Sequence, residues 1–153
     1  MDWKKILGWL ILIVAGLFLA IQLIPYGREH TNPPLVSEQQ WEHPQAMGAA
    51  QKACYDCHSN QTEWPWYSNV APISWLIEND VKEGRRILNF SEWPHYPERE
   101  EMIEVVAEGE MPPFYYVWLH PEADLSAGDK EALIQSFRGL APRGGADGED
   151  GDD

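Results

Sequence analysis

The sequence predicts a small all-α domain that follows a single N-terminal transmembrane helix. An almost unbroken apolar run over residues 6–24 is long enough to cross a bilayer. Apolar residues then recur at the three-to-four-residue spacing of a helix over 72–88, and 97–108 and 126–138 also carry apolar residues for a core. No alternation of strand and helix patterns is visible, which disfavours a sheet-based fold.

The apolar run has the features of an uncleaved membrane anchor. As a helix, its 19 residues would be about 28 Å long, close to the thickness of the hydrocarbon core. Lys4 and Lys5 indicate that the N-terminal residues 1–5 are cytoplasmic. A cleaved signal peptide would usually have an Ala-x-Ala site, which residues 19–22 lack. We therefore expect residues 6–24 to stay in the membrane and the rest of the chain to be exported.

Three further regions follow the anchor. Residues 25–45 are proline-rich and read either as a stalk or as a segment that wraps the domain, since Leu35, Val36 and Trp41 could pack against it. Residues 46–140 form the expected folded domain, and 141–153 form an acidic, glycine-rich tail that we expect to be disordered. The net charge of -14 argues against nucleic acid and suits a basic protein partner, although a merely soluble acidic surface would have the same charge.

The most informative motif is Cys-x-x-Cys-His, formed by Cys54, Cys57 and His58. This spacing is typical of c-type haem attachment. One turn of helix brings both sulfurs to the edge of a porphyrin, and the adjacent imidazole can then bind the iron. We expect one covalently bound haem per chain, and we expect the motif to lie in, or just after, a helix over residues 46–57.

Other uses of the two cysteines are open but less favoured. A structural zinc site normally needs four ligands, and the remaining histidines show no His-x3-His spacing. A thioredoxin-like pair would lie in a βαβ pattern, which is not visible. A plain disulfide or two free thiols are the remaining possibilities.

The segment 109–113, Gly-Glu-Met-Pro-Pro, offers a second iron ligand. Met111 precedes a proline, which favours an extended backbone and a stiff loop. A thioether is a soft ligand that favours ferrous iron. Met111 is therefore the predicted distal ligand; His95 or His120 could replace it, whereas Met47 and Met102 fall in predicted helices and suit a core.

The predicted helix over 72–88 carries Arg85 and Arg86 near its C-terminal end. Basic groups there complement the helix dipole. They could also pair with haem propionates, although most terminal arginines are simply solvated.

With both motifs placed, the chain resembles a class I cytochrome c in outline. It is more closely similar to the bacterial haem-binding domain family of short, anchored, monohaem proteins. The resemblance is carried by CYDCHSNQTEWPWYSNVAPISW at 54–75, EGRRILNFSEW at 83–93 and GEMPPFYYVWLHPEADLS at 109–126. It implies a small cytochrome c-like helical domain, thioethers at Cys54 and Cys57, His58 as proximal ligand and Met111 as distal ligand.

These features predict an electron carrier rather than an enzyme. An iron bound by His58 and Met111 has no open site for a substrate, yet can exchange electrons. The expected location is the bacterial cytoplasmic membrane, with the haem domain in the periplasm, where haem-attachment machinery acts and redox proteins would be the partners. The alternative is a haem-based sensor or gas-binding module in which the distal methionine is absent or dissociates. A peroxidase-like enzyme would need a distal acid–base group, for which only His95 and His120 are candidates.

Overall fold

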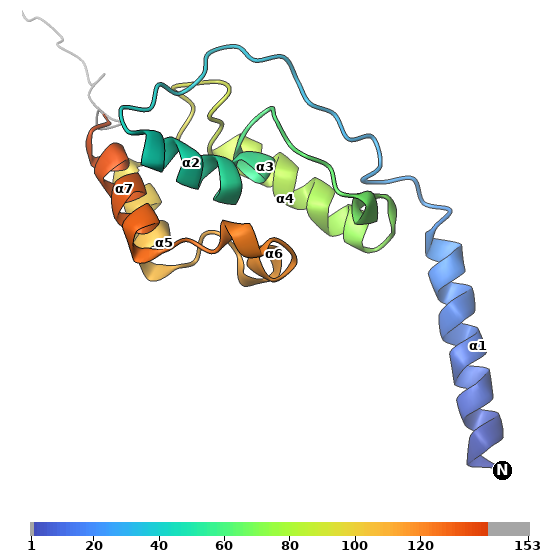
Figure 1. The fold of residues 1–153 in the computed structure, drawn as a ribbon. Helices are drawn as coiled ribbons and strands as arrows, with labels where there is room; N and C mark the ends of the chain where they lie inside the picture. Colours follow the sequence, from blue (N-terminus) through green and yellow to red (C-terminus); the bar gives the residue numbers. More distant parts are fainter. Residues whose placement is uncertain (1, 141–153) are drawn as a thin grey trace, which may run out of the picture.

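The computed structural model describes residues 2–140. Seven α-helices, two short 3₁₀ helices and no β-strand occur in that range, which confirms the all-α prediction (Figure 1). The predicted acidic tail, 141–153, lies outside the described residues. The division into anchor, linker, domain and tail is not tested by this arrangement and stays a prediction.

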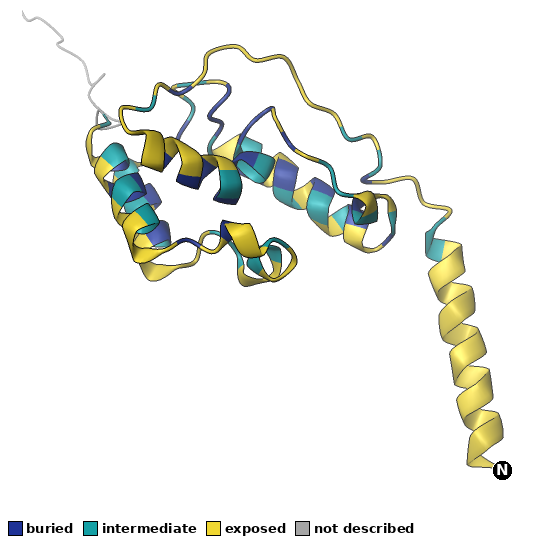
Figure 2. Cartoon of the chain, in the orientation of Figure 1, coloured by how far each residue is buried: buried dark blue, intermediate teal, exposed yellow. Residues whose placement is uncertain are grey.

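Helix α1 (Trp3–Ile21) projects away from the helical domain (Figure 1). It contains no buried residue and is exposed up to its last residue, Ile21, which is half-buried (Figure 2). A helix of this length and composition could cross a membrane or act as a signal sequence. The predicted apolar run, 6–24, thus coincides largely with one continuous helix.

The proline-rich segment that follows α1 runs along the domain and bonds to it. The backbone amide of Gln39 donates to the Phe90 carbonyl at 2.9 Å, and the Trp41 indole donates to the Tyr55 hydroxyl at 3.0 Å. Leu35 and Val36 remain exposed, so Trp41 supplies the packing. Of the two arrangements that the sequence allows, the described contacts correspond to a segment that wraps the domain.

Three helices enclose the apolar core. Helix α2 (Pro44–Ala53) presents only alanines to it, which lets α7 (Ala127–Arg138) approach closely, and α5 (Arg99–Glu108) packs along α7. The helix predicted over residues 97–108 begins two residues later than expected, at Arg99. The buried side chains of these helices are Ala46, Ala49, Ala50, Ala53, Met102, Val106, Leu133, Ile134 and Phe137.

The Cys-x-x-Cys-His motif lies just after α2 rather than within it. The backbone leaves helical geometry at Cys54, with φ -128° and ψ -36°, and a separate one-turn helix, α3 (Tyr55–His58), follows. Helix α4 (Ile73–Ile87) packs against α3 and agrees with the predicted 72–88 segment. The remaining short elements are η1 (Trp66–Asn69), α6 (Phe114–Leu119) and η2 (Pro121–Ala123).

A capping box opens α7, at a Ser126–Asp129 spacing that in the sequence resembles a helix start. The Ser126 hydroxyl accepts from the backbone amide of Asp129 at 3.1 Å, and the Asp129 carboxylate accepts from the Ser126 backbone amide at 3.2 Å. The Lys52 ammonium of α2 also donates to Asp129 at 2.8 Å. These contacts, that from Lys52 above all, lower the pKa of Asp129 from 3.8 to about 2.

Asp129→Asn is expected to destabilise the chain by about 1 kcal/mol at pH 7, the usual scale for a cap with one ion pair. Because the carboxyl pKa is lower in the folded chain, its contribution is complete above pH 3.8 and disappears as the pH falls toward 2. Urea unfolding of both chains at pH 7, 4 and 2 checks this. A difference in the free energy of unfolding between the two chains that stayed constant down to pH 2 would contradict this prediction.

Candidate functional site

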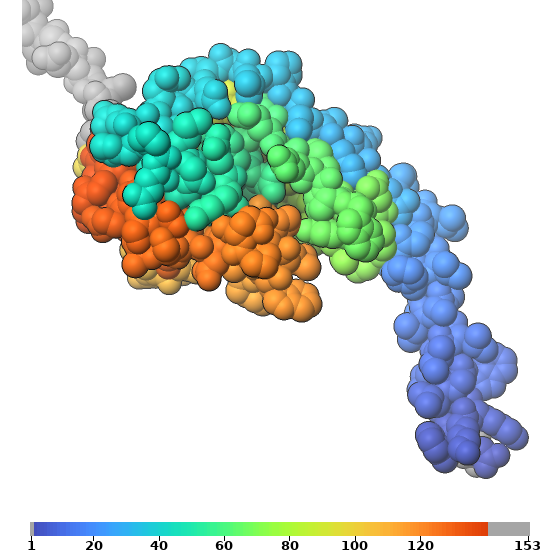
Figure 3. All heavy atoms as spheres, in the orientation of Figure 1, coloured from blue at the N-terminus to red at the C-terminus, as the bar shows by residue number. Residues whose placement is uncertain are grey.

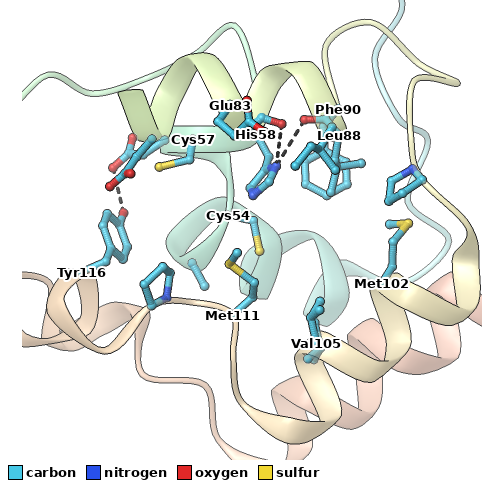
Figure 4. A pocket seen from close by; sticks show the side chains of 18 of the residues that line it. Cys54, Cys57, His58, Glu83, Leu88, Phe90, Met102, Val105, Met111 and Tyr116 are labelled. Atoms are coloured by element: carbon cyan, nitrogen blue, oxygen red, sulfur yellow. Dashed lines mark hydrogen bonds between the residues drawn. The ribbon is translucent and has the colours of Figure 1, made fainter. Parts of the chain in front are cut away.

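A cavity of about 270 Å³ lies between α3 and α4 on one side and α5, the Met111 loop and α6 on the other (Figure 4). Cys54, Cys57, His58 and Met111 all line it, so the structure brings the four predicted site residues together. Most of the remaining lining is apolar, including Leu88, Phe90 and Val105. Such a cavity suits a large, flat, apolar group with a few polar attachment points.

His58 is oriented by the backbone of α4. Its Nδ1 lies 3.0 Å from the Gly84 carbonyl and 3.3 Å from the Leu88 carbonyl. Carbonyl oxygens only accept, so Nδ1 carries the proton and Nε2 keeps its lone pair. Burial lowers the pKa of His58, which favours the neutral ring.

The second ring nitrogen of His58 is free for a metal. Among residues 2–140, Nε2 has no hydrogen-bond partner, and the ring points into the cavity toward Met111 (Figure 4). A ligating histidine typically donates its other N–H to a carbonyl or carboxylate, which fixes the ring orientation. The chemistry of this donor set therefore fits an iron porphyrin.

Both cysteines are free thiols in an apolar setting. Burial raises the pKa of Cys54 and of Cys57 to about 12, so both are neutral at pH 7. Neutral thiols are poor nucleophiles, which does not suit a thioredoxin-like pair. Within the described range, no group of three or more His, Cys, Asp or Glu side chains is placed to hold a metal ion, so the additional ligands of a structural zinc site are not found there.

The Met111 loop is held at its start by the end of α5. Gly109 adopts a left-handed conformation, φ 77°, and closes the helix. The amides of Glu110 and Met111 then both donate to the Val105 carbonyl, at 2.9 and 3.1 Å. The Met111 side chain reaches the cavity from the side opposite His58 and is 38% exposed (Figure 4).

The other methionines and histidines are placed differently. Met102 also lines the cavity but is buried in the core, and Met47 lies on the surface of α2. Neither His95 nor His120 lines the cavity. His95 Nε2 contacts the Arg86 carbonyl at 2.7 Å, and His120 Nε2 contacts the Tyr67 hydroxyl at 2.7 Å.

Arg85 stabilises the domain instead of lining the cavity. Its guanidinium donates to four oxygens at 2.7 to 2.9 Å, from Ser59, Thr31, Asn32 and Thr62, and so ties the N-terminal segment to α4. Arg86 pairs with Glu83 on the surface. The charged residues that line the cavity are all acidic in the described part of the chain: Asp56, Asp80, Glu83 and Glu101. The propionate role considered for Arg85 does not agree with these contacts.

A hydrogen-bonded cluster beside the motif was not evident from sequence. The Tyr116 hydroxyl donates to Asp56 at 2.8 Å, and the Tyr116 ring stacks on His120 with centroids 4.4 Å apart. Burial, followed by the Asp56 charge, raises the pKa of Tyr116. This cluster fixes α6 against the Cys-x-x-Cys-His turn, although the two segments are about 60 positions apart.

Gly84 allows α4 to approach α3. A β-carbon there would overlap the Cys57 carbonyl. The Gly84 carbonyl also orients His58, so Gly84 both permits the close packing of α4 on α3 and positions the imidazole. An isolated glycine inside a helical pattern is the one sequence signal that could have pointed to this contact.

Gly84→Ala is expected to destabilise the chain by about 1–3 kcal/mol, because α4 must move away from Cys57. Gly48→Ala is the matched control: it lies inside α2 with open space around it, and should stabilise by about 0.5–1 kcal/mol. Urea unfolding of the three chains in the same detergent gives the comparison. Equal effects of the two substitutions would mean that the α3–α4 contact is not tight.

Comparisons with known proteins identify the family of this cavity-containing domain. No curated protein and no solved structure gave a significant match. A family model described as a haem-binding domain matches residues 16–138, which include the end of α1 and all the elements around the cavity. The match covers well over half of the chain, and its description agrees with the donor set in the cavity. The chain therefore belongs to the haem-binding domain family.

Proposed function

We propose that the chain is a membrane-anchored monohaem c-type cytochrome that transfers electrons on the periplasmic side of a bacterial cytoplasmic membrane. In this proposal Cys54 and Cys57 hold the haem through thioether bonds, and His58 and Met111 are the axial ligands. A haem held there would accept and donate one electron reversibly, because its iron changes between the ferric and ferrous states.

The observation that carries the proposal is the arrangement of His58. Its Nδ1–H bonds to Gly84 and Leu88 leave Nε2 directed into a cavity that also contains both thiols and Met111. The apolar walls would exclude water from the bound group. The side chains that would fix the group thus come from Cys54 and α3 and from the loop after α5.

The surroundings of the cavity support a carrier rather than an enzyme. His95 and His120, the histidines considered as distal acid–base groups, have ring nitrogens bonded elsewhere and do not line the cavity. The acidic groups along its edge, among them Asp80 and Glu83, would attract a basic redox protein. Export by α1, with Lys4 and Lys5 on the cytoplasmic side, would expose this edge to periplasmic partners.

Visible spectra with and without carbon monoxide test the proposal. The full chain is purified from a host that has the haem-attachment machinery, and its oxidised and reduced forms are recorded. The expected result is a sulfur-to-ferric-iron charge-transfer band in the oxidised form and no rapid binding of carbon monoxide by the reduced form. A colourless, correctly exported chain would contradict the proposal.

One observation favours a second candidate, a gas-binding or sensor module. Met111 is 38% exposed and lies in a loop rather than in the core, so its thioether has room to move away. Rapid carbon monoxide binding by the unaltered chain, with the haem still covalently attached, would favour this candidate over the electron carrier.

A further inference from the structure

Large apolar side chains are exposed on three elements of the domain. They come from η1, the start of α4 and α6, and they are Trp66, Ile73, Leu76, Phe114, Trp118 and Leu119. We call these residues the apolar face. Trp66, Phe114 and Trp118 are 79, 85 and 81% exposed, which is unusual for side chains of this size.

The three elements that carry the apolar face contact one another. Ile73, Leu76 and Leu119 line one small cavity of about 80 Å³, so α4 and α6 meet there. The Trp66 ring contacts Tyr67 edge-on with centroids 5.7 Å apart, and the Tyr67 hydroxyl bonds to His120, directly after α6. The three elements therefore contribute to one surface.

Helix α6 has two different sides. Tyr115 and Tyr116 line the haem cavity, whereas Phe114 and Trp118 are exposed. None of its six residues, Phe-Tyr-Tyr-Val-Trp-Leu, carries a charge. Water solvates a short, uncharged helix with exposed aromatic side chains poorly. Such a helix suits the interface region of a bilayer, where Trp and Tyr are enriched.

The end of α1 is fixed next to the apolar face. The Gln22 side chain donates to the Ala71 carbonyl at 2.8 Å and accepts from the Ala71 amide at 3.0 Å. Ser74 donates to the Tyr26 carbonyl at 3.4 Å, and Gly27 packs so closely on Ser74 that a β-carbon would overlap its carbonyl. The chain that leaves α1 is thus bonded on both sides of Ile73.

The direction of α1 then determines what covers the apolar face. Figure 3 shows α6, in orange, at the lower edge of the domain, and α1 extends from the domain in that same direction. A membrane crossed by α1 would begin where α1 ends, at the level of Ile73. The apolar face would then contact the lipid headgroups of that membrane.

We propose that the apolar face rests on the lipid membrane that α1 spans. This rests on the part of the proposed function in which α1 stays in the membrane as an anchor. Aromatic side chains at the boundary bury their rings without charge pairing, which suits a chain of net charge -14 that an anionic surface would otherwise repel. Contact through α6 holds the Met111 side of the haem cavity close to the membrane surface.

Cysteine accessibility in vesicles tests this contact. Trp118→Cys and Phe114→Cys report on the apolar face, and Val36→Cys is the matched control, since Val36 is 77% exposed and lies on the wrapping segment. Each full-length, haem-loaded chain is inserted in vesicles of phosphatidylcholine and phosphatidylglycerol. It is then treated with a sulfonated, water-soluble maleimide or with an apolar maleimide, and labelling rates are read by peptide mass spectrometry.

The sulfonated reagent is expected to label positions 114 and 118 at least about tenfold more slowly than position 36, because reaction needs the minor, lifted state of the face. The apolar reagent, which enters the bilayer, should label positions 114 and 118 faster than the sulfonated reagent does, with each rate expressed relative to position 36. Equal rates with the sulfonated reagent would show that the face is in water and would overturn the proposal. A deficit relative to position 36 that is the same with both reagents would overturn it too, because protein rather than lipid would then cover the face.

The same samples separate this proposal from the proposed function. Cys54 and Cys57 are unreactive if they carry thioethers, so labelling of their peptide contradicts covalent haem attachment whatever happens at 114 and 118. Loss of the chain from the vesicles on washing would contradict the anchor, and with it the lipid contact.

Discussion

Met111→Ala is expected to keep the haem attached while the sulfur-to-iron charge-transfer band disappears and the reduction potential falls. The reason is that a thioether stabilises ferrous iron, and its removal leaves water or no ligand on that side. We expect a decrease on the order of 0.2 V, a fraction of the ~0.8 V over which axial ligands tune haem potentials. Potentiometric titration, with spectra at each step, gives both quantities.

Met47→Ala is the matched control for this prediction. Met47 is also 38% exposed but lies on α2 and does not line the cavity, so its loss should leave the spectrum and the potential unchanged. If Met111→Ala leaves the charge-transfer band intact, Met111 is not the ligand. Met102, the other methionine that lines the cavity, would be the next to substitute.

Replacing Cys54 and Cys57 together with serine is expected to make essentially all of the haem extractable by acidic acetone, or to yield a chain without haem. Bonds from His58 and Met111 to the iron would break when acid protonates the imidazole and unfolds the domain, whereas thioether bonds would survive. The unaltered chain should keep its haem under the same treatment.

The two single substitutions complete this series. Cys54→Ser or Cys57→Ser leaves one thioether, so most of the haem should stay with the chain but with an altered spectrum. Haem that is fully extractable from the unaltered chain would mean that the cavity binds it without any covalent bond.

Much of the fold could be predicted because it depends on local patterns. The apolar period of 72–88 predicts α4 to within a residue at each end, and the Ser126–Asp129 spacing predicts the cap of α7. Helix α6 has no comparable signal, since six residues that follow two prolines are too few to show a period. The wrapping of residues 25–43 depends on contacts with Tyr55 and Phe90, which lie far along the chain.

In the candidate site, too, some residues could be predicted from sequence motifs and others could not. Cys54, Cys57, His58 and Met111 stand in short motifs, and the structure places all four around one cavity. The groups that orient them do not stand in motifs. Gly84 and Leu88 act on His58 through backbone carbonyls, which any residue has, so no side chain reports that role.

Arg85 shows the limit of an argument from charge alone. A basic residue near a helix end suits a propionate, but its guanidinium can only serve the acceptors that tertiary packing brings to it. Here these are the oxygens of Ser59, Thr31, Asn32 and Thr62, from segments on both sides of the motif. Their convergence depends on the whole fold.

The most direct test of covalent haem attachment is the mass of the exported full-length chain, measured by mass spectrometry under denaturing conditions. Covalent attachment predicts a single species heavier than the polypeptide by one haem, with the added mass on the peptide that contains Cys54 and Cys57. A chain of bare polypeptide mass, isolated from a host that attaches haem to other proteins, would contradict it.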